Sequence, residues 1–132
     1  MDDRWLKSKS FLLERNNGTG GKIWGSEGET DISTAAYINA MLAHTLELDD
    51  VHPASKTHGS ASLIPAAWSC ARYVHASGKE FLTAVVCGYE TVSRIGMALG
   101  VTSHRKKAGM PLLPAEVLAA QLPAGSFWAE CR

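Results

Sequence analysis

Ionisable and hydroxyl side chains are concentrated in one short stretch, residues 47–59, which separates two apolar, alanine-rich runs. The stretch contains carboxylates at Glu47, Asp49 and Asp50, imidazoles at His52 and His58, and also Lys56 and Thr57. Burying such groups between hydrophobic helices is costly unless each group has a partner or a ligand. The stretch therefore predicts a binding or catalytic site.

The two histidines and two of the aspartates offer the groups that proton transfer requires. Histidine is the side chain that exchanges protons most readily near neutral pH. Asp49 and Asp50 could each act as a base, as a metal ligand or as an acceptor for N–H groups. The hydroxyl of Thr57 and the backbone amide of Gly59, on either side of His58, suit the binding of a carboxylate.

Positive charge for an anionic substrate is available at two places in the chain. Lys56 lies within the polar stretch, and a basic cluster follows later at residues 103–107. His104, Arg105 and Lys106 belong to this cluster, which taken alone is typical of a solvated turn. Near the acidic stretch, it could instead receive a carboxylate group.

The same residues have a structural interpretation that carries no chemistry. Asp49 could cap a turn while His52 and Lys56 face solvent. A metal site would need His52, His58 and an aspartate, and their spacing matches no compact zinc or iron pattern. We therefore expect no metal.

The composition bounds the class of protein. The 132 residues are enough for one domain. Lys plus Arg and Asp plus Glu number 13 each, so the formal charge is zero, whereas nucleic-acid binders carry a basic excess. No apolar run approaches the roughly 20 residues of a membrane span. We expect neither nucleic-acid nor membrane partners.

The cysteines and the first residues indicate the compartment. Cys70, Cys87 and Cys131 are odd in number and widely spaced, which favours free thiols in a reducing cytoplasm over a disulfide framework. Residues 1–4 lack the basic and apolar regions of a secretory signal. We expect a cytoplasmic protein. His44 and His75 are expected to be core or helix-end histidines.

Three helices are predicted around the polar stretch. The first runs from Thr34 to about Leu48, with Asp31 or Ser33 as its N-cap. The second spans residues 60–75, where Pro65 is awkward unless regular hydrogen bonding starts only near Ile64. The third spans residues 79–99 and is the clearest, because its apolar residues follow the helical period for over five turns. These residues are Leu82, Val85, Val86, Tyr89, Val92, Ile95, Gly96 and Leu99.

The remaining segments are less regular. Residues 1–21 are polar and poorly patterned, with room for one short helix. Residues 22–25 suit a short extended piece, and residues 26–30 suit a surface turn. Short connections between the helices favour a packed helical array, so the predicted fold class is all-α.

Several segments, in order, resemble the signature of the MmgE/PrpD family, which includes 2-methylcitrate dehydratase and cis-aconitate decarboxylase. They are residues 35–40, 43–52, 57–60, 64–67, 77–84, 88–90, 94–96 and 103–107. The resemblance covers about residues 22–107. It implies part of a mostly helical domain. In the family this domain is normally accompanied by a smaller α/β domain, and the protein is normally a homodimer.

The resemblance also implies an activity: lyase chemistry on small polycarboxylates, without a metal or any other cofactor. By matching positions, it places Asp49, Asp50 and His52 in the acidic part of the site and His58 at the substrate. His104, Arg105 and Lys106 match a basic segment of the family that leads towards a second histidine of the site. In a dehydratase, a base removes a proton next to a carboxylate while an acid protonates the departing hydroxyl. A decarboxylase instead protonates the carbanion, and fixed positive charges stabilise the enolate-like intermediate.

Family members are several hundred residues long, so the chain resembles a fragment. We expect it to have little or no activity alone, because it retains one loop of the site. The alternative is a small helical protein without catalysis, which binds carboxylates or pairs with a full-length homologue.

Residues 108–132 depart from the resemblance. Family members continue after the basic cluster with Gly-Trp-His-Ala-Thr, whereas this chain reads Ala-Gly-Met-Pro from residue 108. Grouping the third base of each codon with the first two of the next turns Met110–Pro111 into alanine and allows Trp, His and Thr around it. We therefore expect an out-of-frame tail after the loss of one base near Lys107. A nucleotide sequence whose shifted frame does not encode Trp-His-Ala-Thr would contradict this.

Overall fold

The computed structural model describes residues 3–99, and these form helices with one small hairpin. The helices are α1 (Asp3–Arg15), α2 (Ile32–His44), α3 (Gly59–Tyr73) and α4 (Gly78–Leu99). The antiparallel strands are β1 (Gly21–Lys22) and β2 (Glu29–Thr30). The predicted helical fold is confirmed. The expected out-of-frame tail lies outside the described residues.

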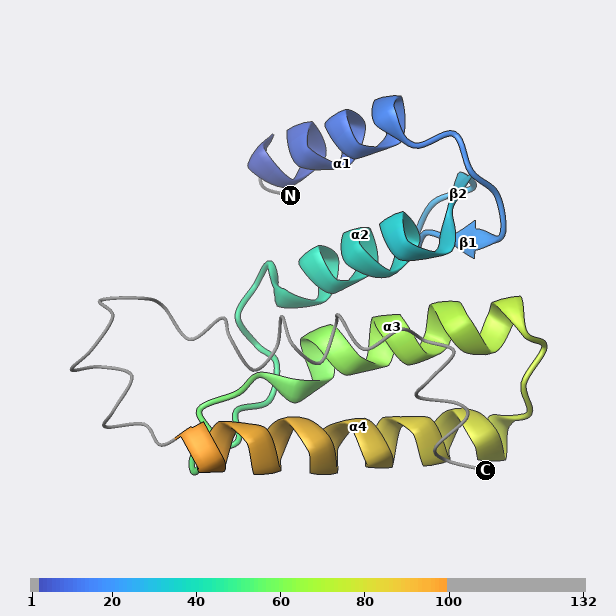
Figure 1. Cartoon of the computed structure of the whole chain (residues 1–132). Coiled ribbons are helices and arrows are strands. Elements are labelled where there is room, and N and C mark those ends of the chain that lie inside the picture. Colours follow the sequence, from blue (N-terminus) through green and yellow to red (C-terminus); the bar gives the residue numbers. More distant parts are fainter. Residues whose placement is uncertain (1–2, 100–132) are drawn as a thin grey trace.

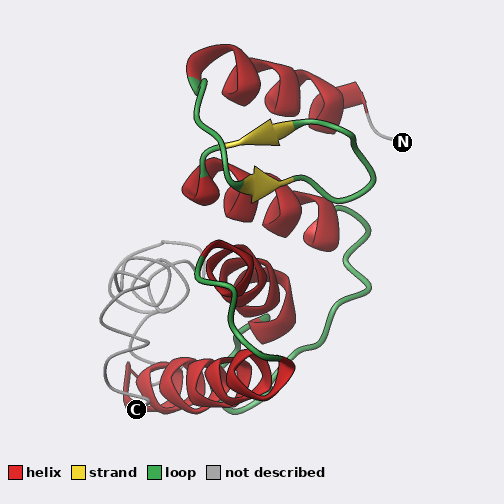
Figure 2. Cartoon of the chain, turned by 90° about the vertical axis from the view of Figure 1, so that its right-hand side faces the viewer, coloured by secondary structure: helices red, strands yellow, loops and turns green. Residues whose placement is uncertain are grey.

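The helices stack in the order in which they occur in the chain. Figure 1 shows α1 above α2, α2 above α3, and α3 above α4, with successive helices running in opposite directions. Figure 2 shows the same layers from the side, with the hairpin between α1 and α2. Contacts join α1 to α2, α2 to α3, and α3 to α4. The polar stretch therefore lies where α2 ends and α3 begins.

Helix α2 begins as predicted and ends earlier than predicted. The Asp31 side chain accepts a hydrogen bond from the Thr34 backbone N–H at 3.0 Å, which makes Asp31 the N-cap. The helix ends at His44 rather than near Leu48. Glu47 has a positive φ of 50°, which a helix does not allow, and the Leu48 side chain is 85% exposed. Within residues 3–99 no apolar surface covers Leu48, so continuing the helix would not bury its side chain there.

Helix α3 contains Pro65 within its regular hydrogen-bonded part. The helix begins at Gly59, so the expectation that regular bonding starts only near Ile64 is wrong. Pro65 is fully buried in the second turn. Its ring removes only the bond to the carbonyl of Ala61, and packing of the buried ring offsets that loss.

Helix α4 starts with a capping box. The Ser77 N–H donates to the Glu80 carboxylate at 2.8 Å, and the Glu80 N–H donates to the Ser77 hydroxyl at 3.3 Å. The predicted apolar face is partly wrong, because Leu82 and Val86 are 62% and 63% exposed. The buried positions recur every four residues: Val92 and Gly96 belong to the predicted face, whereas Ala84 and Gly88 do not.

The small residues on α4 explain this change of face, because they let neighbouring segments approach closely. A Cβ on Gly88 would lie 2.9 Å from the side chain of Leu63 on α3. A Cβ on Gly96 would lie 2.5 Å from the Cβ of Ser55 in the polar stretch. Periodicity weights large apolar side chains, whereas close packing here selects the small ones.

The hairpin is fixed to α2 by a buried amide. Asn39 is fully buried; its Oδ1 accepts from the Trp24 N–H at 2.9 Å and its Nδ2 donates to the Lys22 carbonyl at 3.0 Å. Ile23 and Ile38, each 1% exposed, pack in the core beside this amide. Of the extended piece predicted at residues 22–25, only Lys22 lies in a strand, and the predicted turn at residues 26–30 includes the second strand at Glu29–Thr30.

Two of the three cysteines lie in the described part of the chain. Cys70 and Cys87 are free and half-buried, and burial raises the pKa of the Cys70 thiol. Cys131 lies outside the described residues. Among residues 3–99, every helix is too short or too polar to cross a membrane.

The N-cap of α2 gives a pH-dependent prediction. Burial tends to raise the pKa of Asp31, but hydrogen bonds from Thr34 and Ser33 outweigh it and hold the pKa below its usual value. Asp31→Ala is expected to lower the free energy of unfolding by about 1 kcal/mol at pH 7. Because a carboxylate with a lowered pKa loses its contribution as pH falls through the folded-state value, the difference shrinks below about pH 4.

Urea unfolding at pH 7 and pH 3 measures this difference. Ser33→Ala serves as the control, because the Ser33 side chain is exposed and was the other candidate cap. An Asp31→Ala effect of equal size at both pH values would contradict the prediction.

Candidate functional site

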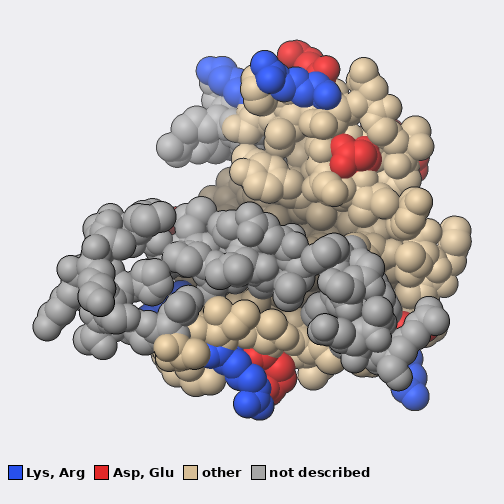
Figure 3. Space-filling model, in the orientation of Figure 1, with Lys and Arg blue, Asp and Glu red and all other residues tan. Residues whose placement is uncertain are grey.

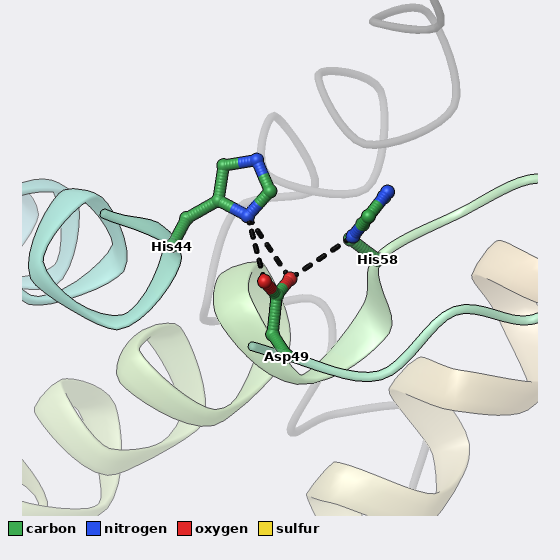
Figure 4. Close-up of side chains that lie close together, drawn as sticks. All are labelled: His44, Asp49 and His58. Atoms are coloured by element: carbon green, nitrogen blue, oxygen red, sulfur yellow. Dashed lines mark hydrogen bonds and ion pairs between the residues drawn. The ribbon is translucent and has the colours of Figure 1, made fainter. Parts of the chain in front are cut away.

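Three side chains converge where α2 ends and α3 begins. The Nδ1 atom of His44 lies 3.0 Å from both Asp49 carboxylate oxygens, and the Nδ1 atom of His58 lies 3.1 Å from Oδ2 of the same residue. We call His44, Asp49 and His58 the histidine–aspartate cluster. Figure 4 shows both rings directing Nδ1 toward the carboxylate between them. The ring centroids lie 5.1 Å apart with the rings nearly perpendicular.

Backbone structure explains why the three residues meet. His44 is the last residue of α2, and His58 is the N-cap residue of α3. The positive φ of Glu47 turns the chain back after α2, so that Asp49 lies between the two helix ends. Two of the three groups are thus held by helices, and the loop holds the third.

The cluster has a buried acceptor and accessible rings. The Asp49 side chain is 5% exposed, whereas those of His44 and His58 are 48% and 33% exposed. Burial tends to raise the pKa of Asp49, but hydrogen bonding to His44 and His58 outweighs it and lowers the pKa. An ionised Asp49 only accepts hydrogen bonds, so the neutral rings carry their proton on Nδ1. Nε2 is then the basic nitrogen of each ring.

Asp50 faces the other side of the loop from Asp49. Its Oδ1 accepts from the Ser60 N–H at 2.8 Å and its Oδ2 accepts from the Tyr89 hydroxyl at 3.0 Å. These bonds outweigh burial and lower the pKa of Asp50; burial and the bond to Asp50 raise the pKa of Tyr89. His58 makes no side-chain cap bond at the start of α3. Asp50 therefore caps α3 and joins it to α4.

His52 takes part in the internal structure of the loop. Its Nδ1 lies 2.7 Å from the Ser55 hydroxyl, which lies 2.7 Å from the Thr57 hydroxyl. The His52 N–H also donates to the Thr57 carbonyl at 2.9 Å. Ser55 and Thr57 are 5% and 2% exposed. These contacts keep residues 52–57 in a compact turn in which Lys56 is exposed with a φ of 57°.

Gly59 lies beneath an aromatic ring. A Cβ at this position would lie 2.4 Å from Cε1 of Tyr89, so only glycine lets the ring cross the start of α3. Its backbone is buried there. The predicted residues His104, Arg105 and Lys106 lie outside the described residues.

A separate hollow of about 440 Å³ lies beside the turn, on the α4 side. It is lined by His52, Val86, Tyr89, Glu90, Ser93, Arg94 and Met97. Arg94 pairs with Glu90 at 2.7 Å on the exposed surface of α4. The members of the histidine–aspartate cluster do not line this hollow, so the loop separates two different environments.

The structure thus divides the residues that the sequence grouped together. Asp49 and His58 meet, Asp50 caps a helix, and the hydroxyl of Thr57 and Nδ1 of His52 bond within the turn. His44 was expected to be a core or helix-end histidine, and it is at a helix end, but its place in the cluster was missed. Its spacing, five residues before Asp49 at the end of an apolar helix, was the available signal.

Comparison with known proteins supplies a family. The MmgE/PrpD N-terminal domain matches residues 6–125 of this chain. Cis-aconitate decarboxylase-like protein oryM of Aspergillus oryzae is 38% identical over 72 residues, which cover 49% of this chain and 15% of that protein. The chain thus aligns with a small part of this curated relative. No solved structure matches the chain.

Proposed function

Because the chain belongs to the MmgE/PrpD family, we propose that its histidine–aspartate cluster serves lyase chemistry on small polycarboxylates. The relative from A. oryzae is named as cis-aconitate decarboxylase-like, which favours a substrate of this chemical class. The observation that carries the proposal is the contact between His58 and Asp49, at 3.1 Å.

This contact prepares His58 for proton transfer. A buried carboxylate that accepts from Nδ1–H fixes the tautomer of the ring and its orientation, and it stabilises the ring after a proton is gained. The exchangeable site is then Nε2. His44 contacts Asp49 through Nδ1 in the same way, so the cluster offers two imidazole rings that share one carboxylate.

Either reaction of the family can use such a pair. In elimination of water, one ring removes the proton next to a substrate carboxylate and the other protonates the departing hydroxyl. In loss of carbon dioxide, one protonated ring delivers a proton to the carbanion that remains. Both schemes need positive charge to hold the substrate carboxylates, for which we propose Lys56 and the segment with His104, Arg105 and Lys106.

We expect the 132-residue chain to bind polycarboxylates with little turnover. Backbone NMR shifts on addition of cis-aconitate or 2-methylcitrate should be largest at residues 47–59, and His58→Gln should abolish them. His75→Gln is the matched control, because His75 is an exposed histidine just beyond the end of α3. Turnover should be far below the roughly 1 per second at the low end of ordinary enzyme rates.

Two results would count against these expectations. Shifts spread evenly over the chain, or unchanged in His58→Gln, would contradict a carboxylate site at the cluster. Turnover of either acid at ordinary enzyme rates would confirm the chemistry and contradict the expected inactivity of this chain.

Exposed apolar side chains favour a second candidate, in which the chain pairs with a full-length homologue. Leu82, Val86 and Met97 on α4 are 62%, 63% and 48% exposed. On the face drawn in Figure 3, the described residues that can be seen outside the grey area include few Lys, Arg, Asp and Glu side chains. Co-purification with a homologue that weakens in Leu82→Glu/Val86→Glu would support pairing, and unchanged co-purification would refute it.

A further inference from the structure

We propose that the histidine–aspartate cluster binds one divalent transition-metal ion, of the Zn²⁺, Co²⁺ or Ni²⁺ class. The inference concerns the same residues as the proposed function, but it depends only on their geometry and not on the lyase chemistry. It also departs from the metal-free chemistry that the family resemblance implies.

The donor atoms of the cluster lie close together and are of the types that bind transition metals. One oxygen of Asp49 and one ring nitrogen from each of His44 and His58 lie within 4.8 Å of one another. Two imidazoles and one carboxylate are a ligand set that suits zinc and the later first-row metals, with open positions for water or another ligand. Calcium and magnesium prefer oxygen ligands instead, so the donor set selects the transition metals.

The distances from the two Nδ1 atoms to the Asp49 carboxylate fit ligands of one shared ion. Ligand atoms at about 2.1 Å from one ion lie about 3–4 Å from each other, and the Nδ1-to-carboxylate distances here are 3.0 and 3.1 Å. An ion between the three groups would take the place of the two hydrogen-bonding protons. Each neutral ring then moves its proton from Nδ1 to Nε2, so that both Nδ1 lone pairs face the ion.

The two rings are accessible to solvent, and the ends of two helices hold them in place. The half-exposed rings of His44 and His58 leave an entry path, whereas the carboxylate beneath them is 5% exposed. The end of α2 and the start of α3 hold the two rings. Asp50, the neighbour of Asp49, is held by Ser60 and Tyr89, so the loop that carries the third ligand is also fixed.

An ion bound at the cluster would interfere with proton transfer by the two rings. The ion would engage both rings and the carboxylate that orients them, so these groups could no longer exchange protons through the same arrangement. Under the proposed function, the ion therefore acts as an inhibitor of the cluster rather than as a cofactor.

Calorimetric titration of the full chain with Co²⁺, without any carboxylate ligand, tests the site. We expect calorimetry to give one ion per chain. The absorption spectrum of the Co²⁺ complex should show a visible band from nitrogen and oxygen ligands, without the charge-transfer band of a thiolate. His44→Ala, Asp49→Asn and His58→Ala should each weaken binding by about tenfold or more, a loss that even outer partners of a metal site can cause. Circular dichroism verifies that each variant is folded.

His75→Ala is the matched control, because it removes an exposed imidazole about 20 Å away, at the other end of α3. Affinity in this variant should stay unchanged. Three results would each overturn the proposal: absence of binding by the unsubstituted chain, an affinity in the cluster variants equal to that of the unsubstituted chain, or a loss in His75→Ala as large as in the cluster variants. Failure of polycarboxylate binding alone would leave the metal site standing, so the two proposals are separable.

Discussion

Asn39→Ala is expected to lower the free energy of unfolding by about 2–5 kcal/mol, because it leaves two backbone groups without partners. The amide accepts from the Trp24 N–H and donates to the Lys22 carbonyl, and Asn39 itself is 0% exposed. Each fully buried group left unpaired costs about 1–3 kcal/mol, and the upper end of that range does not apply because both bonds are only part-buried. A small domain has only about 5–15 kcal/mol of stability in total, so this change alone could unfold much of the population.

Two further variants separate the amide bonds from mere loss of volume. Asn39→Asp keeps an acceptor for the Trp24 N–H but places an oxygen against the Lys22 carbonyl, so it should also destabilise the chain. Tyr37→Ala, on the same helix with a side chain that is 60% exposed, should change stability by roughly 0.5 kcal/mol or less. Urea unfolding followed by circular dichroism measures all three. Equal effects of Asn39→Ala and Tyr37→Ala would exclude an anchoring role for the amide.

Gly59→Ala is expected to lower the free energy of unfolding by about 1–3 kcal/mol, although alanine normally favours a helix. The added Cβ would lie 2.4 Å from Cε1 of Tyr89 and 2.9 Å from its Cδ1. The ring must move, and its hydroxyl then loses the 3.0 Å bond to Asp50. The effect would therefore extend from the start of α3 to α4 and to the loop that carries Asp49.

A glycine at the start of another helix provides the control. Gly78 is the first residue of α4, and a Cβ there would meet nothing within 4 Å. Gly78→Ala should leave stability unchanged or raise it by about 0.4–1 kcal/mol, because it restricts the unfolded chain. A double-mutant cycle with Tyr89→Ala should show that removing the ring cancels much of the cost at Gly59. Strict additivity would mean that the contact with Tyr89 is not the cause.

The sequence predicted the helices well because their signals are local. Alanine-rich runs, the Asp31 cap and the long periodic segment that forms α4 act over a few residues each. The same signals failed where packing decides. Leu48 continued an apolar pattern yet is 85% exposed, and Leu82 and Val86 on the predicted apolar face of α4 are 62% and 63% exposed.

The candidate site was predicted as a region and not as an arrangement. Chemical type alone placed Asp49, Asp50 and His58 in one group, but type does not reveal direction. The loop backbone directs the two carboxylates to different partners: Asp49 meets two histidines, whereas Asp50 meets Tyr89, 39 residues away. Histidine at a helix end is common, and only the fold of the loop shows that His44 shares a carboxylate with His58.

The stacking of each helix on its chain neighbour has a consequence for how the protein forms. Contacts between adjacent helices close short loops, which costs little entropy, and such local topologies fold in about microseconds to milliseconds. The hairpin and α2, which Asn39 joins, can assemble with α1 during synthesis before α4 has been made. The histidine–aspartate cluster can form once α3 begins, whereas the Asp50–Tyr89 bond must wait for α4. The two aspartates of one loop would therefore find their partners at different times.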